Sequence, residues 1–349
     1  MNRSPARGVD VVKHVGIAAV AVAIVVIVSP GIGTQPISVI EAWRHWPDDS
    51  SAVHHIAFDL RLPRAVTALV AGATLALAGG VFQTLFRNPL ATPYTLGIAS
   101  AGSLGALIGL KMGLAGTLLG LPQYSWCALL TSAMVVGLIF LLAGTTYRLS
   151  GNALVLAGVT IGLFCGAMMM FVTYVSDVRE TFAIVRWMMG SLEKYGYGEI
   201  TGIIGPLIVS WTVLIACAGR LNQFEMGDEL AASRGVNLFR LHLATIGFAS
   251  LATACIVSVC GPIGFVGLIV PHAARLVIGR DHRVLLPAVA LWGAVFLVVC
   301  DWFSVLAPVW AGRWTGMEST AAPLPIGVVT ALVGAPLFLV LLGRSRRVE

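Results

Sequence analysis

The chain has 349 residues, of which 58% are hydrophobic and only 11% are charged, whereas soluble globular chains carry about 25% charged residues. This composition excludes a water-soluble globular protein and a disordered one. The net charge of +6 comes from an excess of Lys and Arg whose positions along the chain, described below, predict topology and give no indication of nucleic-acid binding.

Long segments without Asp, Glu, Lys, Arg or His recur along the whole chain. About 20 apolar residues cross the hydrocarbon core of a bilayer as a helix, and a soluble core does not need a series of such segments. The sequence therefore predicts an all-α, polytopic membrane protein. The segments are Val15–Ile40, Ala65–Phe86, Asn88–Leu110, Met112–Tyr147, Leu149–Ser176, Ile200–Gly219, Leu243–Pro271 and Ser319–Gly343.

Proline and glycine divide the longest of these segments. Gly120–Pro122 interrupts one of them, so its main span is expected at about 123–145. The stretch Leu243–Gly279 is too long for one crossing, and Gly261–Gly264 should split it, because proline removes a backbone donor and glycine weakens a helix. A further span runs past Asp301. The total is about ten transmembrane helices, and an even number places both termini on one side.

The distribution of charge predicts which side that is. The termini and the loops on their side hold 14 of the 22 Lys and Arg residues but 6 of the 16 acidic ones, and the opposite loops hold 8 and 10. Basic residues accumulate in cytoplasmic loops of membrane proteins. Both termini are therefore expected in the cytoplasm, and the protein is expected in the cytoplasmic (inner) membrane.

Motifs of catalysis and of metal binding are missing from the sequence. It contains no phosphate-binding loop, no His-Glu-x-x-His and no Gly-x-Ser-x-Gly, so no ATPase site, catalytic residue, cofactor or metal site is expected. The six cysteines lie within apolar runs without a Cys-x-x-Cys pair, as small buried hydrophobes do. Energy for transport then comes from a partner protein or from an ion gradient.

A gradient-driven secondary transporter is the alternative function, and an intramembrane enzyme is a third, less favoured one. Secondary transporters bury ionisable residues within their spans as relays. Asp301 is the main such residue here, and a structural role opposite an interfacial Arg or a backbone group is the preferred interpretation. Paired Gly/Pro interruptions in two halves of a chain mark transport sites, and Arg87–Pro93 and Gly261–Phe265 form such a pair.

The loop at about 219–242 is the longest predicted cytoplasmic connection. Its segment Gly227–Gly235 is predicted to form a short helix. Asp228 is expected to cap its start, Arg234 to lie in its last turn and Gly235 to end it in a left-handed conformation. Helices shorter than about 12 residues are marginal alone in water. The segment is therefore expected to dock, either on its own membrane domain or on a soluble partner.

The chain resembles the FecCD/BtuC-type permeases, the membrane subunits of type II ABC importers for iron–siderophore, haem and cobalamin. The resemblance depends on a series of short motifs in fixed order along nearly the whole chain. They are Arg61–Arg64, Gly72–Gly79 with Gln83, Arg87–Ala91, Leu156–Gly158, Trp187–Ser191, Met226–Gly235, Gly261–His272, Asp281–Arg283, Leu324–Gly327 and Gly334–Pro336.

The resemblance implies one transmembrane permease domain over residues 1–349, with ten helices and a BtuC-like fold. It implies a homodimer with the pathway on its two-fold axis and two copies of an ATP-binding subunit on the cytoplasmic side. A periplasmic or lipoprotein substrate-binding protein is implied outside. The cargo implied is a metal chelate, with ferric siderophore first because it is the commonest in the family, followed by haem or cobalamin.

The resemblance also implies roles for particular residues. Arg61 and Arg64 correspond to arginines that dock acidic residues of the binding protein, as bidentate guanidinium groups can. Val305 and Pro323 stand where the family often has a basic residue and a Glu. The residues implied to couple transport to the ATPase are Gly227, Asp228, Glu229, Ala231, Arg234 and Gly235, and those implied to form the inner gate of the pathway are Asn88, Leu90, Gly151 and Asn152.

Overall fold

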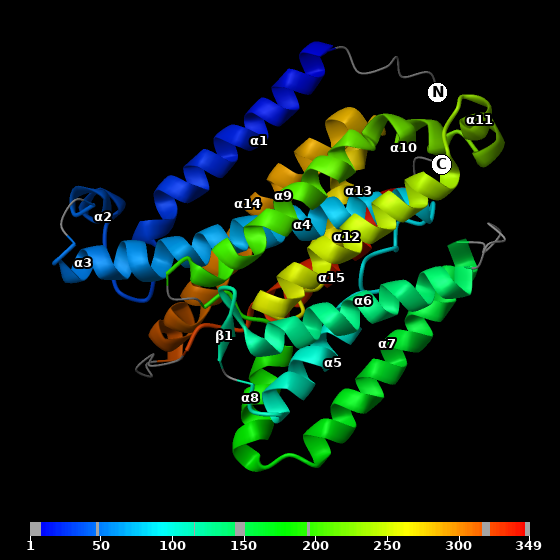
Figure 1. The fold of residues 1–349 in the computed structure, drawn as a ribbon. Helices are drawn as coiled ribbons and strands as arrows, with labels where there is room; N and C mark the ends of the chain where they lie inside the picture. The colour runs from blue at the N-terminus through cyan, green and yellow to red at the C-terminus, as the bar shows by residue number, and fades with distance from the viewer. Residues whose placement is uncertain are drawn as a thin grey trace.

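The structure is a computed structural model that describes residues 8–46, 49–114, 116–143, 151–193, 196–315 and 322–345. Within these ranges the chain is a bundle of helices with one two-stranded hairpin (Figure 1). The elements are α1 (Gly8–Val28), η1 (Ser29–Gly31), α2 (Val39–Arg44), α3 (Ala52–His54), η2 (His55–Arg61), α4 (Leu62–Leu85), α5 (Ile98–Lys111), β1 (Thr117–Leu118), β2 (Leu121–Pro122), α6 (Gln123–Ala143), α7 (Gly151–Tyr174), α8 (Val178–Met188), α9 (Gly198–Ala216), α10 (Ala218–Glu225), α11 (Asp228–Ser233), α12 (Leu238–Cys260), α13 (Val266–Ile278), α14 (His282–Thr315) and α15 (Ile326–Ser345).

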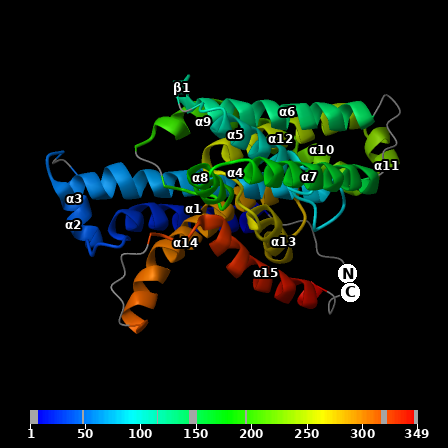
Figure 2. The ribbon, with the colours of Figure 1, turned by 90° about the horizontal axis from the view of Figure 1, so that it is seen from below.

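The helices confirm the predicted polytopic architecture. Among the described residues, 7 helices are long and apolar enough to cross a membrane, and three shorter apolar helices, Ile98–Lys111, Val266–Ile278 and Ile326–Leu341, accompany them. Together they account for the predicted spans. In Figures 1 and 2, α1 begins and α15 ends on the side of the molecule where α11 lies, as an even number of crossings requires.

Helix α4 is the centre of the bundle and packs against α12, α13 and α14. Glycines make this packing close, because a Cβ atom on Gly72 would collide with the backbone of Gly293 in α14. A Cβ atom on Gly79 would likewise collide with the backbone of Gly267 in α13. Without a hydrophobic driving force between helices in lipid, such close backbone approach supplies the packing energy.

The predicted break between α12 and α13 is confirmed. Helix α12 ends at Cys260, the left-handed residues Gly261 (φ 71°) and Phe265 (φ 67°) follow, and α13 begins at Val266. Pro271 then removes a helical donor within α13 and frees the carbonyl of the residue four positions earlier. That residue is Gly267, and its carbonyl accepts a hydrogen bond from Nε2 of Gln83 on α4 at 3.3 Å.

The prediction for the third span is wrong in its first part. The sequence suggested a span from Asn88, but α5 begins only at Ile98. The segment in between contains Pro89 and Pro93 and folds as a series of turns, and Gly97 (φ 73°) precedes the helix. An uncharged run does not distinguish a helix from such a loop, whereas its prolines do.

Candidate functional site

The predicted coupling helix is α11, and it lies at one end of the bundle beyond α10 (Figure 1). Gly227 (φ 121°) precedes it and Gly235 (φ 82°) follows it, both in the left-handed region that favours glycine. The predicted left-handed stop at Gly235 is therefore confirmed. The predicted cap is wrong, because Gly227 is the N-cap residue and Asp228 is the first residue of the helix.

The carboxylate of Asp228 binds Arg87 instead. Nη2 of Arg87 donates to Oδ1 of Asp228 at 2.5 Å and to the carbonyl oxygen of Phe224 at 2.9 Å. The guanidinium group also lies 4.7 Å from the centre of the Phe224 ring, within cation–π range. Arg87 itself has a left-handed backbone (φ 47°) at the end of α4. These contacts attach the start of α11 to the loop after α4.

The two faces of α11 differ. Ala231 is fully buried in the core, whereas Glu229 and Arg234 are exposed. Met226 and Leu230 expose 61% and 43% of their surface beside them. The outward face thus combines apolar side chains with charges of both signs, a composition that suits contact with another protein.

A chain of polar contacts connects α10 to α4 and α14. The side-chain oxygen of Asn222 on α10 accepts hydrogen bonds from the backbone N–H of His282 (2.8 Å) and from its Nδ1 (2.7 Å), while Nδ2 of Asn222 donates to Asp281 at 2.7 Å. Because Nδ1 of His282 carries the proton, its Nε2 accepts from the hydroxyl of Thr84 on α4 at 2.7 Å. His282 is fully buried, so this network fixes α10 against the membrane helices.

Arg275 on α13 extends the same network. Its Nη2 donates to the hydroxyl of Thr84 at 2.5 Å and to the carbonyl oxygen of Gly80 at 3.1 Å, and its Nη1 lies 3.6 Å from Oε1 of Glu225. Glu225 is the last residue of α10. Burial raises the pKa of Glu225, whereas the positive charges of Arg275, Arg280 and Arg87 act in the opposite direction.

The structure describes the predicted inner-gate residues only in part. Asn88 accepts a hydrogen bond from the backbone N–H of Leu90 at 2.9 Å, which stabilises the turn after α4, and Leu90 is 48% exposed. Gly151 and Asn152 are the first residues of α7, and their side-chain environment lies outside the described part of the chain. Their role as a gate stays a prediction.

The two Gly/Pro interruptions predicted to form a pair, Arg87–Pro93 and Gly261–Phe265, both contribute residues to one cavity. It has a volume of about 230 Å³ and is lined on one side by Thr92, Pro93 and Tyr94 and on the other by 263–265. Chain that is not helical occurs at membrane depth only where protein buries it or where it lines a cavity. The two breaks therefore line the same cavity.

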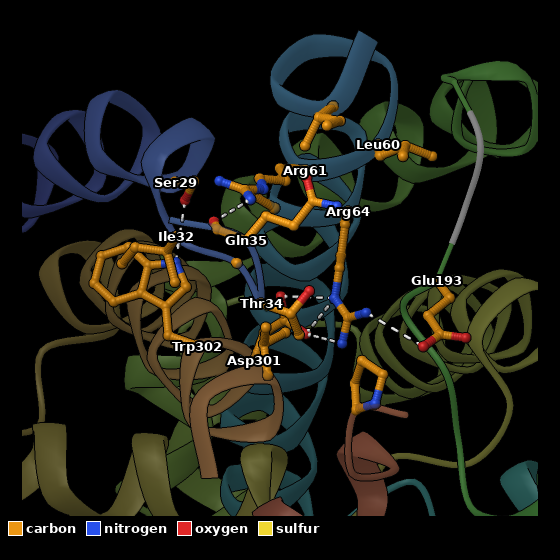
Figure 3. A pocket seen from close by; sticks show the side chains of 15 residues that line it. Ser29, Ile32, Thr34, Gln35, Leu60, Arg61, Arg64, Glu193, Asp301 and Trp302 are labelled. Carbon is orange, nitrogen blue, oxygen red and sulfur yellow. Dashed lines mark hydrogen bonds and ion pairs between the residues drawn. The ribbon is translucent and has the colours of Figure 1, made fainter. Parts of the chain in front are cut away.

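A larger cavity of about 610 Å³ lies at the end of the bundle away from α11. Its lining comes from η1, the start of α4 and α14, among other segments. In Figure 3, Arg64 points toward Asp301 and Glu193. Nε of Arg64 donates to both carboxylate oxygens of Asp301, at 2.8 and 3.1 Å, and Nη1 lies 3.5 Å from Glu193. Asp301 is 4% exposed, so this ion pair fulfils the structural role expected for it.

Arg61 lines the same cavity and binds backbone. Its Nη1 donates to the carbonyl oxygen of Pro30 at 3.0 Å and its Nη2 to that of Gln35 at 2.7 Å. Both predicted docking arginines thus have partners within the chain, and docking stays a prediction. Val305 and Pro323 also line this cavity, so both departures from the family pattern lie beside Arg61 and Arg64.

Within the described ranges, no group of three or more His, Cys, Asp and Glu side chains is placed to hold a metal ion. None of the described cysteines forms a disulfide, and all except Cys127 are buried. The polar groups of both sites pair with one another across helices. The arrangement can hold helices together and present surfaces.

Sequence reasoning missed the network around α10. Arg87 and His282 lay within recognised motifs, and Arg275 and His272 were the only Asp, Glu, Lys, Arg or His residues in the stretch 243–279. An isolated charge in an apolar stretch indicates a buried partner, and that signal was present for Arg275. Nothing in the sequence indicated that Glu225 and Thr84 were the partners.

These features define a class: a polytopic helical membrane protein whose helices are joined by buried polar contacts. Comparison gives the family. The profile of the FecCD transport family matches residues 21–344, and the chain belongs to this family of permease subunits of ABC importers.

Characterised relatives cover most of the chain. It is 37% identical over 290 residues to the cobalamin import system permease protein BtuC of Halobacterium salinarum, covering 83% of this chain and 73% of the relative. It is 36% identical over 325 residues to the hemin transport system permease protein HmuU of Yersinia pestis, covering 91% of each. A solved inward-facing structure described as of the metal-chelate ABC transporter type matches with a TM-score of 0.81 and 30% identity, over 95% of this chain and 99% of that one.

Proposed function

We propose that the chain is a single permease domain that carries a metal chelate across the cytoplasmic membrane, with ferric siderophore as the first candidate and haem and cobalamin next. The names of the relatives support the chelate class, since they include permeases for cobalamin and hemin. A molybdate permease of Haemophilus influenzae, 31% identical, shows that family membership alone does not select the cargo.

The observation that carries the proposal is the attachment of α10 and α11 to the membrane helices. Arg87 binds Asp228, and Asn222 binds the buried His282, so a force on α11 is transmitted to α4 and α14. The outer face of α11 remains exposed and partly apolar. A separate ATP-binding subunit that closes on this face can therefore tilt the helices, with Gly227, Glu229, Arg234 and Gly235 at the contact.

The complete transporter in this proposal is a homodimer of the chain with two ATP-binding subunits in the cytoplasm. A periplasmic or lipoprotein binding protein docks at the end where Arg61 and Arg64 lie. Both termini are cytoplasmic, in agreement with the basic excess on their side. Asn88, Leu90, Gly151 and Asn152 form the inner gate.

Reconstitution in liposomes tests the source of energy. The chain alone should move no chelate uphill, and addition of its ATP-binding subunit, its binding protein and ATP should give concentrative uptake. Uptake by the chain alone under an ion gradient would overturn the proposal in favour of a secondary transporter. In the complete system, dissipation of proton and sodium gradients serves as the control and should leave uptake intact.

The binding protein identifies the cargo. Mass spectrometry of the ligand that copurifies with it should show a metal chelate. Uptake of a labelled ferric siderophore, haem and cobalamin should then differ, with the copurified class preferred. A free oxyanion such as molybdate as the copurified ligand would contradict the chelate assignment while leaving the ATP-driven mechanism in place.

A further inference from the structure

Helix α13 is a short helix of 13 residues with a left-handed residue on each side. Phe265 (φ 67°) precedes it and Gly279 (φ 102°) follows it, both in the left-handed region. A bulky residue such as Phe rarely adopts that region, and such residues concentrate where a structure switches. Since α13 is continuous with neither α12 nor α14, it can change its tilt without bending a longer helix.

The first turn of α13 borders the cavity of about 230 Å³ between the two helix breaks. Gly264, Phe265 and Leu268 line one side of that cavity, and Thr92 and Tyr94 from the segment before α5 line the other. A change in the tilt of α13 would therefore alter the space between the two helix breaks directly.

The last turns of α13 hold the coupling region. Arg275 binds Glu225 at the end of α10, Thr84 and the Gly80 carbonyl of α4 through a single guanidinium group. Glu225 lies two residues before Gly227, the N-cap residue of α11, so its ion pair with Arg275 joins α13 to the end of α10 that leads into α11. The buried His282, which binds the same Thr84 hydroxyl, joins α14 to this point.

The contact between α13 and α4 is close but incompletely hydrogen-bonded. Gly79 and Gly267 bring the two backbones together without intervening side chains. Among the described residues, Oε1 of Gln83 and Nε of Arg275 are buried there without a hydrogen-bond partner. Buried polar atoms are nearly always paired, and these two can gain partners if α13 shifts along α4.

We propose that α13 is a lever and that Arg275 is the positioning residue that attaches it to the coupling region, so that movement of α10 and α11 opens or closes the cavity between the helix breaks. This inference rests on the proposed function, because it assumes that an ATP-binding subunit moves α11. It assigns to Arg275 and Glu225 a role in transmission that is separate from docking.

The experiment compares Arg275→Gln with Arg280→Gln in proteoliposomes that contain the complete transporter. Arg280 is exposed on the loop after α13 and also acts electrostatically on Glu225, so its variant removes a similar charge without the contacts to α4. For Arg275→Gln we expect chelate uptake per ATP hydrolysed to fall about tenfold, in the range of ordinary coupling effects. Stimulated ATP hydrolysis should continue, and Arg280→Gln should behave as the wild type.

Two further variants separate transmission from folding. Arg275→Lys keeps the charge opposite Glu225 but cannot bind Thr84 and Gly80 as a planar fork does, so it should restore part of the coupling. Glu225→Gln, which lies outside the spans, should reproduce the loss seen with Arg275→Gln. If Arg275→Gln cannot be purified, the chelate uptake per ATP hydrolysed of these two variants tests whether Arg275 transmits movement.

Spin labels at Ser233 on α11 and Val277 on α13 give a readout that a purely structural role would not change. In the wild type, their distance distribution should stay narrow with and without ATP, and in Arg275→Gln it should broaden on addition of ATP. If the wild type, Arg275→Gln and Glu225→Gln all take up the same amount of chelate per ATP hydrolysed, the proposed role of α13 and Arg275 is wrong. A wild type that shows no ATP-driven uptake would instead overturn the proposed function.

Discussion

Individual side chains in this protein are held by contacts across helices that are far apart in the sequence. Arg64 and Asp301 are the strongest example, because the guanidinium group binds both carboxylate oxygens and both side chains are largely buried. A buried pair of this kind contributes little net stability over an apolar pair of the same volume, but removal of one partner leaves an uncompensated charge. The pair therefore acts as a constraint on how α4 and α14 are aligned.

Loss of one member of this pair should destabilise the protein more than loss of both. Arg64→Met and Asp301→Leu alone should each cost about 3–5 kcal/mol, whereas the double substitution should cost clearly less. Thermal unfolding in detergent, followed by tryptophan fluorescence, measures the difference. Arg61→Met, which removes bonds to backbone only, is the comparison. A double variant whose loss equals the sum of the two single losses would show that the pair is not coupled.

At the scale of elements, glycines determine how closely the helices approach and where they stop. Gly79 and Gly80 are neighbours on α4 with different surroundings. A Cβ atom on Gly79 would meet the Gly267 backbone, whereas one on Gly80 would lie at ordinary distances, 3.6 Å from Leu286 and Pro271 side-chain atoms. Glycine is thus required for close helix packing at position 79, whereas position 80 has room for a larger residue.

Alanine substitutions at these two positions should have opposite effects. Gly79→Ala should destabilise the bundle by about 1–3 kcal/mol, because backbone cannot move aside as a side chain can. Gly80→Ala should be neutral or stabilising by about 0.5–1 kcal/mol, because alanine favours the helix. Thermal stability in detergent and the yield of monodisperse protein measure both. A stable Gly79→Ala variant would mean that α13 can separate from α4 without cost.

The end of α11 depends on the left-handed backbone of Gly235 in the same way. Gly235→Val should misplace the coupling helix, because a left-handed conformation costs a residue with a side chain about 1–2 kcal/mol and a β-branched one more. We expect ATP hydrolysis to lose its stimulation by the binding protein and uptake to fall. Gly235→Asn is the matched control, since Asn tolerates this region. If Gly235→Val supports stimulated hydrolysis and uptake, the coupling role of α11 is wrong.

At the scale of the whole molecule, the sequence predicted the number of spans and the break between α12 and α13 because both follow from local rules of length and helix chemistry. The start of α5 was misplaced, since a run without charge says nothing about backbone conformation. The partners of Arg64, Arg87 and Arg275 could not be derived from sequence, because pairs such as Arg64 with Asp301 join distant parts of the chain. Short apolar helices bounded by prolines and glycines are also missed by a rule that requires about 20 apolar residues for a membrane span.

The orientation of the molecule is the last prediction, and it follows from the distribution of basic residues rather than from the fold. Ser233 on α11 and Thr34 in the segment between η1 and α2 are exposed, and α11 and α2 lie at opposite ends of the bundle (Figure 1). With the six native cysteines replaced, Ser233→Cys should react with a membrane-impermeant maleimide only in inverted vesicles, and Thr34→Cys only in intact spheroplasts. Basic segments are retained in the cytoplasm during insertion, so the side of α11 should be inaccessible from outside. Labelling of Ser233→Cys in spheroplasts would invert the topology, and the ATP-binding subunit could then not reach α11.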